Sequence, residues 1–265
     1  MNRPTIRRAL ITGASAGIGA EFARQLAVGG SHLILVARRR ERLEALAGEL
    51  RKEHAISVDV CPADLSKDED LDKLETLIAQ TDDLDLLVNN AGFGGAGTFV
   101  KGDVEPHLNM IQVHVIAPVR LTRVALGGMT ARNRGRVINV ASIAAFSPLS
   151  GVTYAATKGY LVRFTQGLQL ELAETEVRVQ ALCPGFTHTE FHAEMAEFKA
   201  SIPKFMWMSA ERIVRTSLRA LGRKSVICVP GGVNRLLAAW MRCPLTYGLT
   251  IGLSKLLYFR KKIEN

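Results

Sequence analysis

A tyrosine and a lysine four residues apart could together move a proton. Tyr154 and Lys158 stand in the segment Tyr-Ala-Ala-Thr-Lys, and this spacing puts both side chains on one helix face. A neighbouring ammonium favours phenolate over phenol, so we expect the pKa of Tyr154 to lie below its usual value near ~10. Ser142, twelve residues upstream, could hydrogen-bond a substrate carbonyl. By itself the pair also fits an ordinary helix surface, so its meaning depends on where the fold places it.

A glycine-rich segment near the N-terminus could hold a phosphate. Residues 12–19 read Thr-Gly-Ala-Ser-Ala-Gly-Ile-Gly, between an apolar strand-like run and a helix-like segment. The first glycine would make the turn, the second would admit a pyrophosphate to the helix N–H groups, and the third would let the helix pack on the strand. This pattern predicts a dinucleotide site made by Gly13, Ser15, Ala16, Gly17, Ile18 and Gly19.

The same residues also fit a second motif. Gly13-Ala14-Ser15-Ala16-Gly17 matches G-x-S-x-G, the turn that presents the nucleophile of many serine hydrolases. That turn normally comes well into its fold, whereas here it follows the first strand-like run and Gly19 continues the dinucleotide spacing. A serine hydrolase that uses Ser15 is therefore the weaker alternative.

The end of the second strand-like run indicates the type of dinucleotide. Enzymes that use NAD usually place Asp or Glu there to bind the ribose hydroxyls. This chain instead continues from Ala37 into Arg38, Arg39 and Arg40. A guanidinium fork suits a phosphate, so we expect Arg38 to bind a 2′-phosphate and NADP to be the cofactor. We interpret Arg39 and Arg40 as a solvated helix start.

Apolar runs of strand length alternate with amphipathic segments along the chain. The expected strands are Ala9–Thr12, Leu33–Ala37, Ser57–Val60, Leu84–Val88, Arg136–Val140, Val177–Leu182 and Val226–Val229. Helical periodicity occurs between them, for example at Ile18–Val28, Glu41–Glu53 and Leu71–Gln80. Such alternation predicts an α/β fold, a single doubly wound domain of Rossmann type over residues 1–265 with a parallel sheet of about seven strands.

Taken together, these features resemble the short-chain dehydrogenase/reductase family, and the resemblance extends from Thr12 to about Pro230. It rests on residues 12–19, Asp64-Leu65, Asn89-Asn90-Ala91-Gly92, Ser142, Tyr154 with Lys158, and Pro184-Gly185 leading to Thr189. The resemblance implies that Tyr154 exchanges the proton, that Lys158 lowers its pKa and binds the nicotinamide ribose, and that Ser142 orients the substrate carbonyl. It also implies cofactor contacts from Asp64, Leu65, Asn90, Ala91, Gly92, Pro184, Gly185, Thr187 and Thr189. The expected reaction is reversible reduction of a carbonyl to an alcohol with NADPH.

One residue departs from the family pattern. The family usually has an Asn where this chain has His114, and that Asn helps to hold a water in a proton relay that reaches the Lys. An imidazole also donates and accepts hydrogen bonds, but it is larger and can be charged. His114 could therefore serve catalysis through an intact or rerouted relay, or be a tolerated substitution on a buried helix. If the replacement at His114 abolishes catalysis, the alternative function is a non-catalytic sensor that binds NADP.

Two apolar segments interrupt the alternation. Residues 186–209 are rich in Phe, Met and His and adjoin the expected cofactor site, so we predict a lid over an apolar substrate. The same side chains could equally pack the lid down. Residues 233–265 form an apolar C-terminal extension with basic residues at intervals. We expect it to support a homodimer or homotetramer, with peripheral membrane contact as the alternative.

Composition restricts the class of protein. A chain of 265 residues with 48% apolar residues can bury a sizeable core, and its net charge of +9 is scattered rather than gathered in an aromatic-studded basic stripe. We therefore expect no nucleic-acid partner. The four cysteines lie far apart without a C-x-x-C, so we predict neither a disulfide framework nor a metal site. No apolar leader or membrane-length run is visible, and we expect a cytoplasmic protein.

Overall fold

The fold is known from a computed structural model, which describes residues 5–147, 151–190, 202–223 and 225–243, together with Gly248 and Gly252. Seven parallel strands form one sheet in the order β3-β2-β1-β4-β5-β6-β7. Their bounds are β1 Arg8–Thr12, β2 His32–Ala37, β3 Val58–Pro62, β4 Leu84–Asn89, β5 Arg136–Val140, β6 Arg178–Leu182 and β7 Ile227–Cys228. The predicted doubly wound α/β fold is confirmed.

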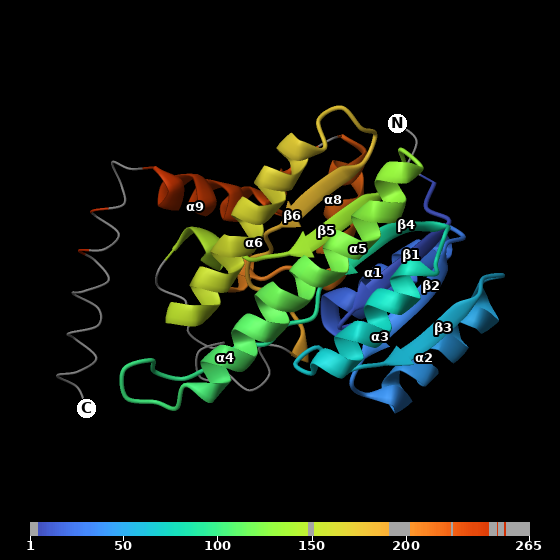
Figure 1. The fold of residues 1–265 in the computed structure, drawn as a ribbon. Helices are drawn as coiled ribbons and strands as arrows, with labels where there is room; N and C mark the ends of the chain where they lie inside the picture. Colours follow the sequence, from blue (N-terminus) through green and yellow to red (C-terminus); the bar gives the residue numbers. More distant parts are fainter. Residues whose placement is uncertain are drawn as a thin grey trace.

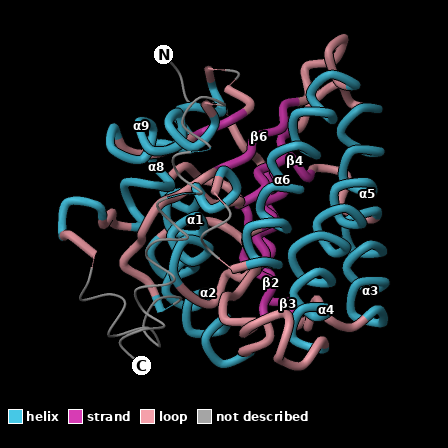
Figure 2. The backbone as a smooth tube through the Cα atoms, turned by 90° about the vertical axis from the view of Figure 1, so that its left-hand side faces the viewer, coloured by secondary structure: helices cyan, strands magenta, loops and turns pink. Residues whose placement is uncertain are grey.

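Helices cover both faces of this sheet (Figure 1). Their bounds are α1 Gly17–Val28, α2 Arg40–Glu53, α3 Asp68–Ala79, α4 Glu105–Ile111, α5 Ala117–Ala131, α6 Val152–Glu171, α8 Ala210–Gly222 and α9 Gly232–Arg242. Helices α1, α2 and α8 lie on one side of the strands, and α3, α4, α5 and α6 lie on the other (Figure 2). Among the helices that the structure describes, none is both long and apolar enough to cross a membrane.

Strand β1 contributes side chains to the apolar cores on both faces of the sheet. Ala9 and Ile11 join the apolar core that contains α1 and α2, whereas Leu10 joins the core that contains α3 and α5. All three side chains are fully buried, because helices cover both faces of the sheet. Such a strand needs apolar residues at consecutive positions, which is why it reads as a continuous run rather than as an alternation.

A buried polar chain crosses the centre of the sheet. Asn89 Nδ2 donates to Thr122 Oγ1 at 2.9 Å and to Asn139 Oδ1 at 2.8 Å, and Asn139 Nδ2 donates to Thr165 Oγ1 at 3.0 Å. These bonds join β4 and β5 to each other and to the helices α5 and α6. Because most buried amides find partners, these bonds hold the middle of α6, at Thr165, on the sheet.

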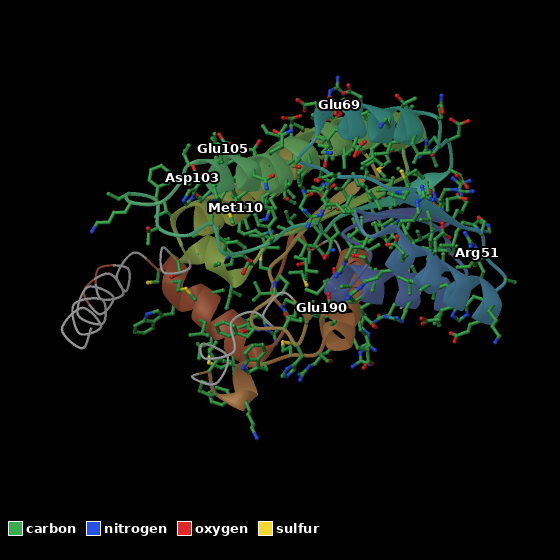
Figure 3. All side chains as sticks on the ribbon, turned by 90° about the horizontal axis from the view of Figure 1, so that it is seen from below. Arg51, Glu69, Asp103, Glu105, Met110 and Glu190 are labelled. Atoms are coloured by element: carbon green, nitrogen blue, oxygen red, sulfur yellow. The ribbon has the colours of Figure 1, made fainter. Side chains whose placement is uncertain are left out.

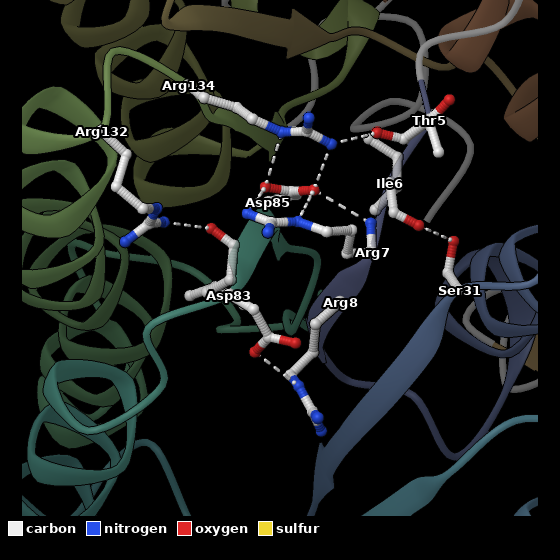
Figure 4. A network of polar contacts seen from close by, with 10 residues as sticks. Thr5, Ile6, Arg7, Arg8, Ser31, Asp83, Asp85, Arg132 and Arg134 are labelled. Carbon is white, nitrogen blue, oxygen red and sulfur yellow. Dashed lines mark hydrogen bonds and ion pairs between the residues drawn. The ribbon is translucent and has the colours of Figure 1, made fainter.

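A buried carboxylate ties together three segments where the strands begin. Asp85, which is fully buried on β4, receives ion pairs from Arg7 Nε at 3.2 Å and from Arg134 Nη2 at 2.7 Å (Figure 4). Arg134 Nη2 also donates to the Thr5 carbonyl at 2.9 Å. This network holds the entry into β1, the strand β4 and the chain after α5 in one place.

The path from α4 to α5 is continuous but changes its winding. Residues Gln112–Ile116 form a π-helical turn, η1, and His114 lies at its centre. Pro118 has no N–H to donate to the carbonyl four residues earlier, which belongs to His114, and its ring would clash with that carbonyl. The wider turn accommodates the proline. Short π-helical turns are costly and often occur at functional sites.

Candidate active site

The glycine-rich turn has the shape that its sequence predicts. Gly13 and Gly17 have positive φ angles of 66° and 57°, a conformation that side-chain-bearing residues rarely adopt. A Cβ on Gly13 would lie 2.8 Å from Asn90 Nδ2, and one on Gly19 would collide with the Gly13 carbonyl. The turn therefore brings α1 against β1 and leaves the first N–H groups of α1 accessible for an anion.

Thr12 holds this turn together, a role that the sequence analysis did not assign to it. The backbone N–H groups of Asn90 and Ala91 donate to Thr12 Oγ1 at 3.0 and 3.1 Å. Asn90 Nδ2 in turn donates to the carbonyls of Thr12 at 2.9 Å and Gly13 at 3.2 Å. Asn90 thus fastens the turn to the end of β4. The sequence feature that could have indicated this role of Thr12 is a hydroxyl residue at the end of an apolar strand.

Arg39, rather than Arg38, contacts the turn. Arg39 Nε and Nη2 donate to Ser15 Oγ at 3.3 and 3.1 Å. Arg38 is exposed and makes no hydrogen bond or ion pair within the described part of the chain. Arg39 and Arg40 are exposed at the start of α2, as predicted, but the Arg39 side chain also turns back toward the glycine-rich turn. Arg40 pairs with Glu44 along α2.

Glu190 connects the chain after β6 to this arginine cluster. Its carboxylate accepts from Arg39 Nη1 at 3.1 Å and from Arg42 Nη1, close to the α1 and α2 end of the sheet (Figure 3). Hydrogen bonds from Arg42 and Arg39 hold the pKa of Glu190 below its usual range. Two guanidinium groups beside Ser15 thus form a cationic border to the turn, although one carboxylate already neutralises part of it.

Ser15 lacks the surroundings of a hydrolase nucleophile. Its hydroxyl accepts from a guanidinium, which cannot act as a base. Among the histidines that the structure describes, none hydrogen-bonds Ser15. A serine nucleophile needs such a base within reach, so the geometry does not support the hydrolase alternative.

Ser142, Tyr154 and Lys158 come together where β5 ends. Ser142 begins a 3₁₀ turn, Ile143–Phe146, and hydrogen-bonds the Tyr154 side chain. Lys158 lies one turn further along α6, with Nζ 5.7 Å from the centre of the Tyr154 ring. Its ammonium is buried and donates to the carbonyl of Val140, the last residue of β5, at 3.0 Å. The i, i+4 spacing thus places both residues on the helix face that the sheet covers.

Burial controls the charges of this group. It raises the pKa of Tyr154 to about 12, although the hydrogen bond from Ser142 acts in the opposite direction. Burial also lowers the pKa of Lys158 to about 8. The expected lowering of the Tyr154 pKa is therefore wrong for this state of the protein, because desolvation outweighs the hydrogen bond with Ser142. Tyr154 is a neutral phenol here, ready to donate its proton.

Gly92 permits a close approach of His114 and Lys158. A Cβ on Gly92 would lie 2.9 Å from His114 Nε2 and 3.4 Å from Lys158 Nζ. His114 is buried, and its Nε2 accepts the backbone N–H of Phe93 at 3.0 Å. The structure therefore places His114 beside the Lys, where the sequence analysis expected the departure from the family to matter.

The segment after β6 meets the same site from the other side. The Ile143 N–H donates to the Pro184 carbonyl at 2.9 Å, and Thr187 Oγ1 donates to the Gly185 carbonyl at 2.9 Å. A Cβ on Gly17 would touch Thr189 Cγ2 at 3.0 Å, so this segment closes over the glycine-rich turn. The contact expected between these residues and a nicotinamide ring stays a prediction.

Asn234, on α9, supports Pro184-Gly185 and was missed. A Cβ on Gly185 would collide with its amide group, which is buried and donates to the Pro230 carbonyl at 2.9 Å. No sequence signal distinguished this Asn from a surface residue. It shows that α9, which includes most of the described part of the C-terminal extension, packs against the segment that follows β6. Residues 244–247, 249–251 and 253–265 of that extension lie outside the described residues.

The remaining predicted cofactor residues have local roles. Asp64 Oδ1 accepts from Ser66 Oγ at 2.8 Å and from the Ser66 N–H at 3.1 Å, so the carboxylate shapes the turn after β3. Leu65 is buried in the core, Ile18 packs on the core from α1, and Ala16 begins that helix. Adenine contacts from Asp64 and Leu65 stay predictions.

Both ends of the predicted lid are paired with each other. The Met208 N–H donates to the Phe186 carbonyl at 2.9 Å, and the His188 N–H donates to the Met208 carbonyl at 3.1 Å. The Trp207 ring stacks on His188 with centres 5.0 Å apart and lies 5.6 Å from Phe186. These aromatic residues pack on one another, and the lid over an apolar substrate stays a prediction. The middle of the lid, residues 191–201, lies outside the described residues.

Comparisons with known proteins show the family of this chain. Residues 7–200 match the family model described as short chain dehydrogenase. The NADP-dependent 3-hydroxy acid dehydrogenase of Schizosaccharomyces pombe is 35% identical over 195 residues, which cover 72% of this chain and 75% of the relative. The structure of a short-chain dehydrogenase from Sphingobium yanoikuyae in complex with NADPH is 32% identical, with a TM-score of 0.81 over 94% of this chain and 95% of that one. The bulky-bulky ketone specific alcohol dehydrogenase from Comamonas testosteroni is also 32% identical, with a TM-score of 0.77 over 85% and 86% of the two chains. This chain belongs to the short-chain dehydrogenase family.

Proposed function

We propose that this protein is an NADPH-dependent oxidoreductase that reversibly reduces an apolar ketone or aldehyde to an alcohol. The observation that carries the proposal is the arrangement of Ser142, Tyr154 and Lys158. The Ser142 hydroxyl is hydrogen-bonded to the neutral Tyr154 phenol, and the buried Lys158 ammonium lies 5.7 Å from the centre of that ring. The phenol can donate a proton to a carbonyl oxygen, and the serine hydroxyl can orient that oxygen.

The residues around the glycine-rich turn fit NADPH. The positive φ angles of Gly13 and Gly17 and the contacts of Gly19 leave no room for side chains at the turn, and a pyrophosphate needs such close access to the backbone. Ser15 and Arg39 would hold a 2′-phosphate at the end of β2, with Arg38 within the same short stretch. When bound, NADPH supplies the hydride; the chain supplies orientation, the proton and the exclusion of water.

Each residue of the proposed site has one task. Ser142 holds the carbonyl oxygen, and Tyr154 transfers its proton to that oxygen as the carbonyl carbon is reduced. Lys158, held by the Val140 carbonyl, stabilises the phenolate that results, because an ammonium beside a phenolate is favourable in a dry site. Solvent then returns a proton to Tyr154. In the reverse direction Tyr154 accepts the alcohol proton.

One relative supports a bulky substrate, because it is named as specific for bulky-bulky ketones. The lid residues Phe186 and Trp207 offer aromatic surface beside the segment that follows β6. We therefore propose a bulky apolar ketone as the substrate class. The oligomeric state, the membrane contact and the cytoplasmic location stay predictions.

Consumption of NADPH with a panel of ketones and aldehydes tests the proposal directly. We expect turnover with bulky apolar ketones, and loss of turnover with retained NADPH binding in Tyr154→Phe. A sensor would bind NADPH in both forms and turn over no carbonyl. A preference for small polar carbonyls would refute the substrate class and leave the reaction type intact.

A further inference from the structure

Two buried histidines each hydrogen-bond a threonine that flanks the proposed acid, Tyr154. His107 Nδ1 lies 2.7 Å from Thr153 Oγ1, and His114 Nδ1 lies 3.2 Å from Thr157 Oγ1. The histidines come from α4 and from η1, whereas both threonines come from the first turns of α6. All four side chains are at least nine-tenths buried. Helix α6 is thus hydrogen-bonded to α4 one residue before Tyr154 and to η1 three residues after it.

The hydrogen bonds of His114 determine its tautomer. A backbone N–H can only donate, so the bond from Phe93 N–H requires His114 Nε2 to be an acceptor. In the neutral ring the proton then sits on Nδ1, which donates to Thr157 Oγ1. The Thr157 hydroxyl in turn donates a hydrogen bond to the Tyr154 carbonyl at 3.0 Å. All three bonds point the same way, from the chain after β4 into α6.

This arrangement leaves His114 no free nitrogen for a proton relay. Protonation of Nε2 would break the bond from Phe93 and would place a cation beside Lys158, since Nε2 and Lys158 Nζ both border the position of a Gly92 Cβ. Burial, followed by the charge of Lys158, lowers the pKa of His114 to about 2. Apart from Lys158, the titratable group that faces His114 in the described part of the chain is Tyr154, whose ring centre lies 5.9 Å away. Neither group would attract a proton to the imidazole.

The surroundings of His107 also indicate that its bond to Thr153 has a function. Its Nε2 is buried and has no hydrogen-bond partner in the described part of the chain, and the Phe99 ring packs on it edge to face at 5.0 Å. An unsatisfied buried nitrogen costs free energy, so an apolar residue would make α4 more stable at this position. The compensating contact is the bond to Thr153, the residue directly before Tyr154.

We propose that the pairs His107–Thr153 and His114–Thr157 form a clasp that sets the rotation of α6, and that His114 is a neutral positioning residue rather than a carrier of the proton. The clasp replaces the relay that the family builds around an Asn. The proposal rests on the proposed function, because its purpose is to aim Tyr154 and Lys158 at a substrate. His114 lies at the centre of the π-helical turn η1, a kind of turn that often occurs at functional sites.

Nuclear magnetic resonance of the whole protein with ¹⁵N-labelled histidine tests the state of His114 without any turnover. We expect the Nδ1–H tautomer and chemical shifts that stay constant from about pH 5 to about pH 9, where an ordinary histidine titrates. The His114 signals are assigned by their loss in His114→Asn. An Nε2–H tautomer, or a titration within that range, would overturn the proposal. A failure to reduce carbonyls would refute the proposed function and leave this result standing.

Matched threonine variants test the positioning role. Thr157→Val and Thr153→Val remove a hydroxyl at nearly constant shape, and we expect each to lower kcat by about 10- to 100-fold, because small misplacements of reacting groups are costly. Thr157→Ser keeps the hydroxyl and should restore kcat to within about threefold of the wild type. The KM for NADPH should stay nearly constant in all three variants.

Thr165→Val is the control for a general loss of stability. Thr165 is a fully buried threonine on the same helix, it accepts from Asn139, and it lies more than two turns beyond Tyr154. We expect this variant to lower Tm and to keep kcat. Equal losses of kcat in Thr165→Val and Thr157→Val, or no loss in Thr157→Val, would overturn the clasp. If a valine variant fails to fold, the histidine spectra of the wild type still decide the tautomer and charge of His114.

Discussion

Arg39 donates two hydrogen bonds to Ser15 Oγ, at 3.3 and 3.1 Å, and thereby joins the end of β2 to the glycine-rich turn. A guanidinium in this place can bind a phosphate together with the serine hydroxyl. Its first neighbour, Arg38, makes no such contact within the described residues. The difference separates two arginines that look equivalent in the sequence, and it leads to the first prediction.

Arg39→Ala should weaken NADPH binding and leave NADH binding unchanged. Loss of one partly exposed, charge-assisted contact to a phosphate corresponds to about a tenfold rise in the Kd for NADPH. Fluorescence titrations with both cofactors measure the ratio. Arg40→Ala is the control, because Arg40 is exposed and, in the described part of the chain, its ion pair is with Glu44. An unchanged ratio of the two Kd values in Arg39→Ala would remove Arg39 from the site, and a larger effect of Arg38→Ala would restore the first interpretation.

Gly92→Ala should impair catalysis without unfolding the protein. The added methyl group would lie 2.9 Å from His114 Nε2, so the imidazole must shift, whereas 3.4 Å from Lys158 Nζ is an ordinary contact. A shift of His114 would disturb its bond to Thr157, so we expect kcat to fall by about 10- to 100-fold. Gly48→Ala, at an open position on α2, is the matched control and should keep full activity. Normal kcat in Gly92→Ala would show that the position of His114 is not critical.

Asp85 should make the stability of the protein depend on pH in the acid range. Burial alone raises the pKa of Asp85, but hydrogen bonds from Arg134 and Arg7 outweigh it, so the folded-state pKa lies below the unfolded value. The stabilisation is therefore complete above the unfolded pKa near ~3.9 and is lost as the pH falls through the folded pKa.

Asp85→Asn should lower the free energy of unfolding at neutral pH by about 2 to 3 kcal/mol, since it removes hydrogen bonds between charged groups from a buried oxygen pair. Both arginines are nearly half exposed and can return to water, which limits the loss. Urea unfolding curves between neutral and acid pH measure the effect. Asp83→Asn, which breaks a more exposed ion pair with Arg8, should cost less than about 1 kcal/mol. Equal effects of the two substitutions would contradict this account of Asp85.

Lys158 should destabilise the protein without cofactor. Its pKa falls to about 8 because burial disfavours the charged form, so between pH 8 and the unfolded pKa near ~10.4 the unfolded state binds more protons. The stability of the wild type relative to Lys158→Met should therefore rise with pH across this range. At pH 7 we expect Lys158→Met to be inactive and more stable by about 1 to 2 kcal/mol, as is common when a buried functional charge is removed. A less stable variant would indicate that the bond to the Val140 carbonyl dominates.

Much of the fold follows from the sequence because strands covered on both faces require continuous apolar runs. Strand β1 shows this. Ala9 and Ile11 face the core on one side of the sheet and Leu10 faces the core on the other, so all three must be apolar. Gly13 and Gly19 were also predictable, because a tight strand-to-helix turn leaves no space for a Cβ. These features depend on local geometry, which spacing encodes.

Contacts that depend on side-chain direction could not be predicted in the same way. Arg39 turns back to Ser15 and Arg38 does not, although both follow the same strand. His107 and Thr153 meet only because α4 packs on α6, and nothing in their sequence spacing pairs them. The pKa of Tyr154 was predicted in the wrong direction because the spacing to Lys158 was visible, whereas the burial of the phenol was not.

The reduction of a bulky apolar ketone by wild-type protein and by Tyr154→Phe tests the central claim most directly. NADPH consumption gives the rate, and a separate NADPH titration shows that the site is intact. We predict an unchanged Kd for NADPH and a kcat lower by about 100- to 10,000-fold, the range for loss of a general acid. A variant that binds NADPH and reduces the ketone as fast as the wild type would contradict the assignment of Tyr154 as the proton donor.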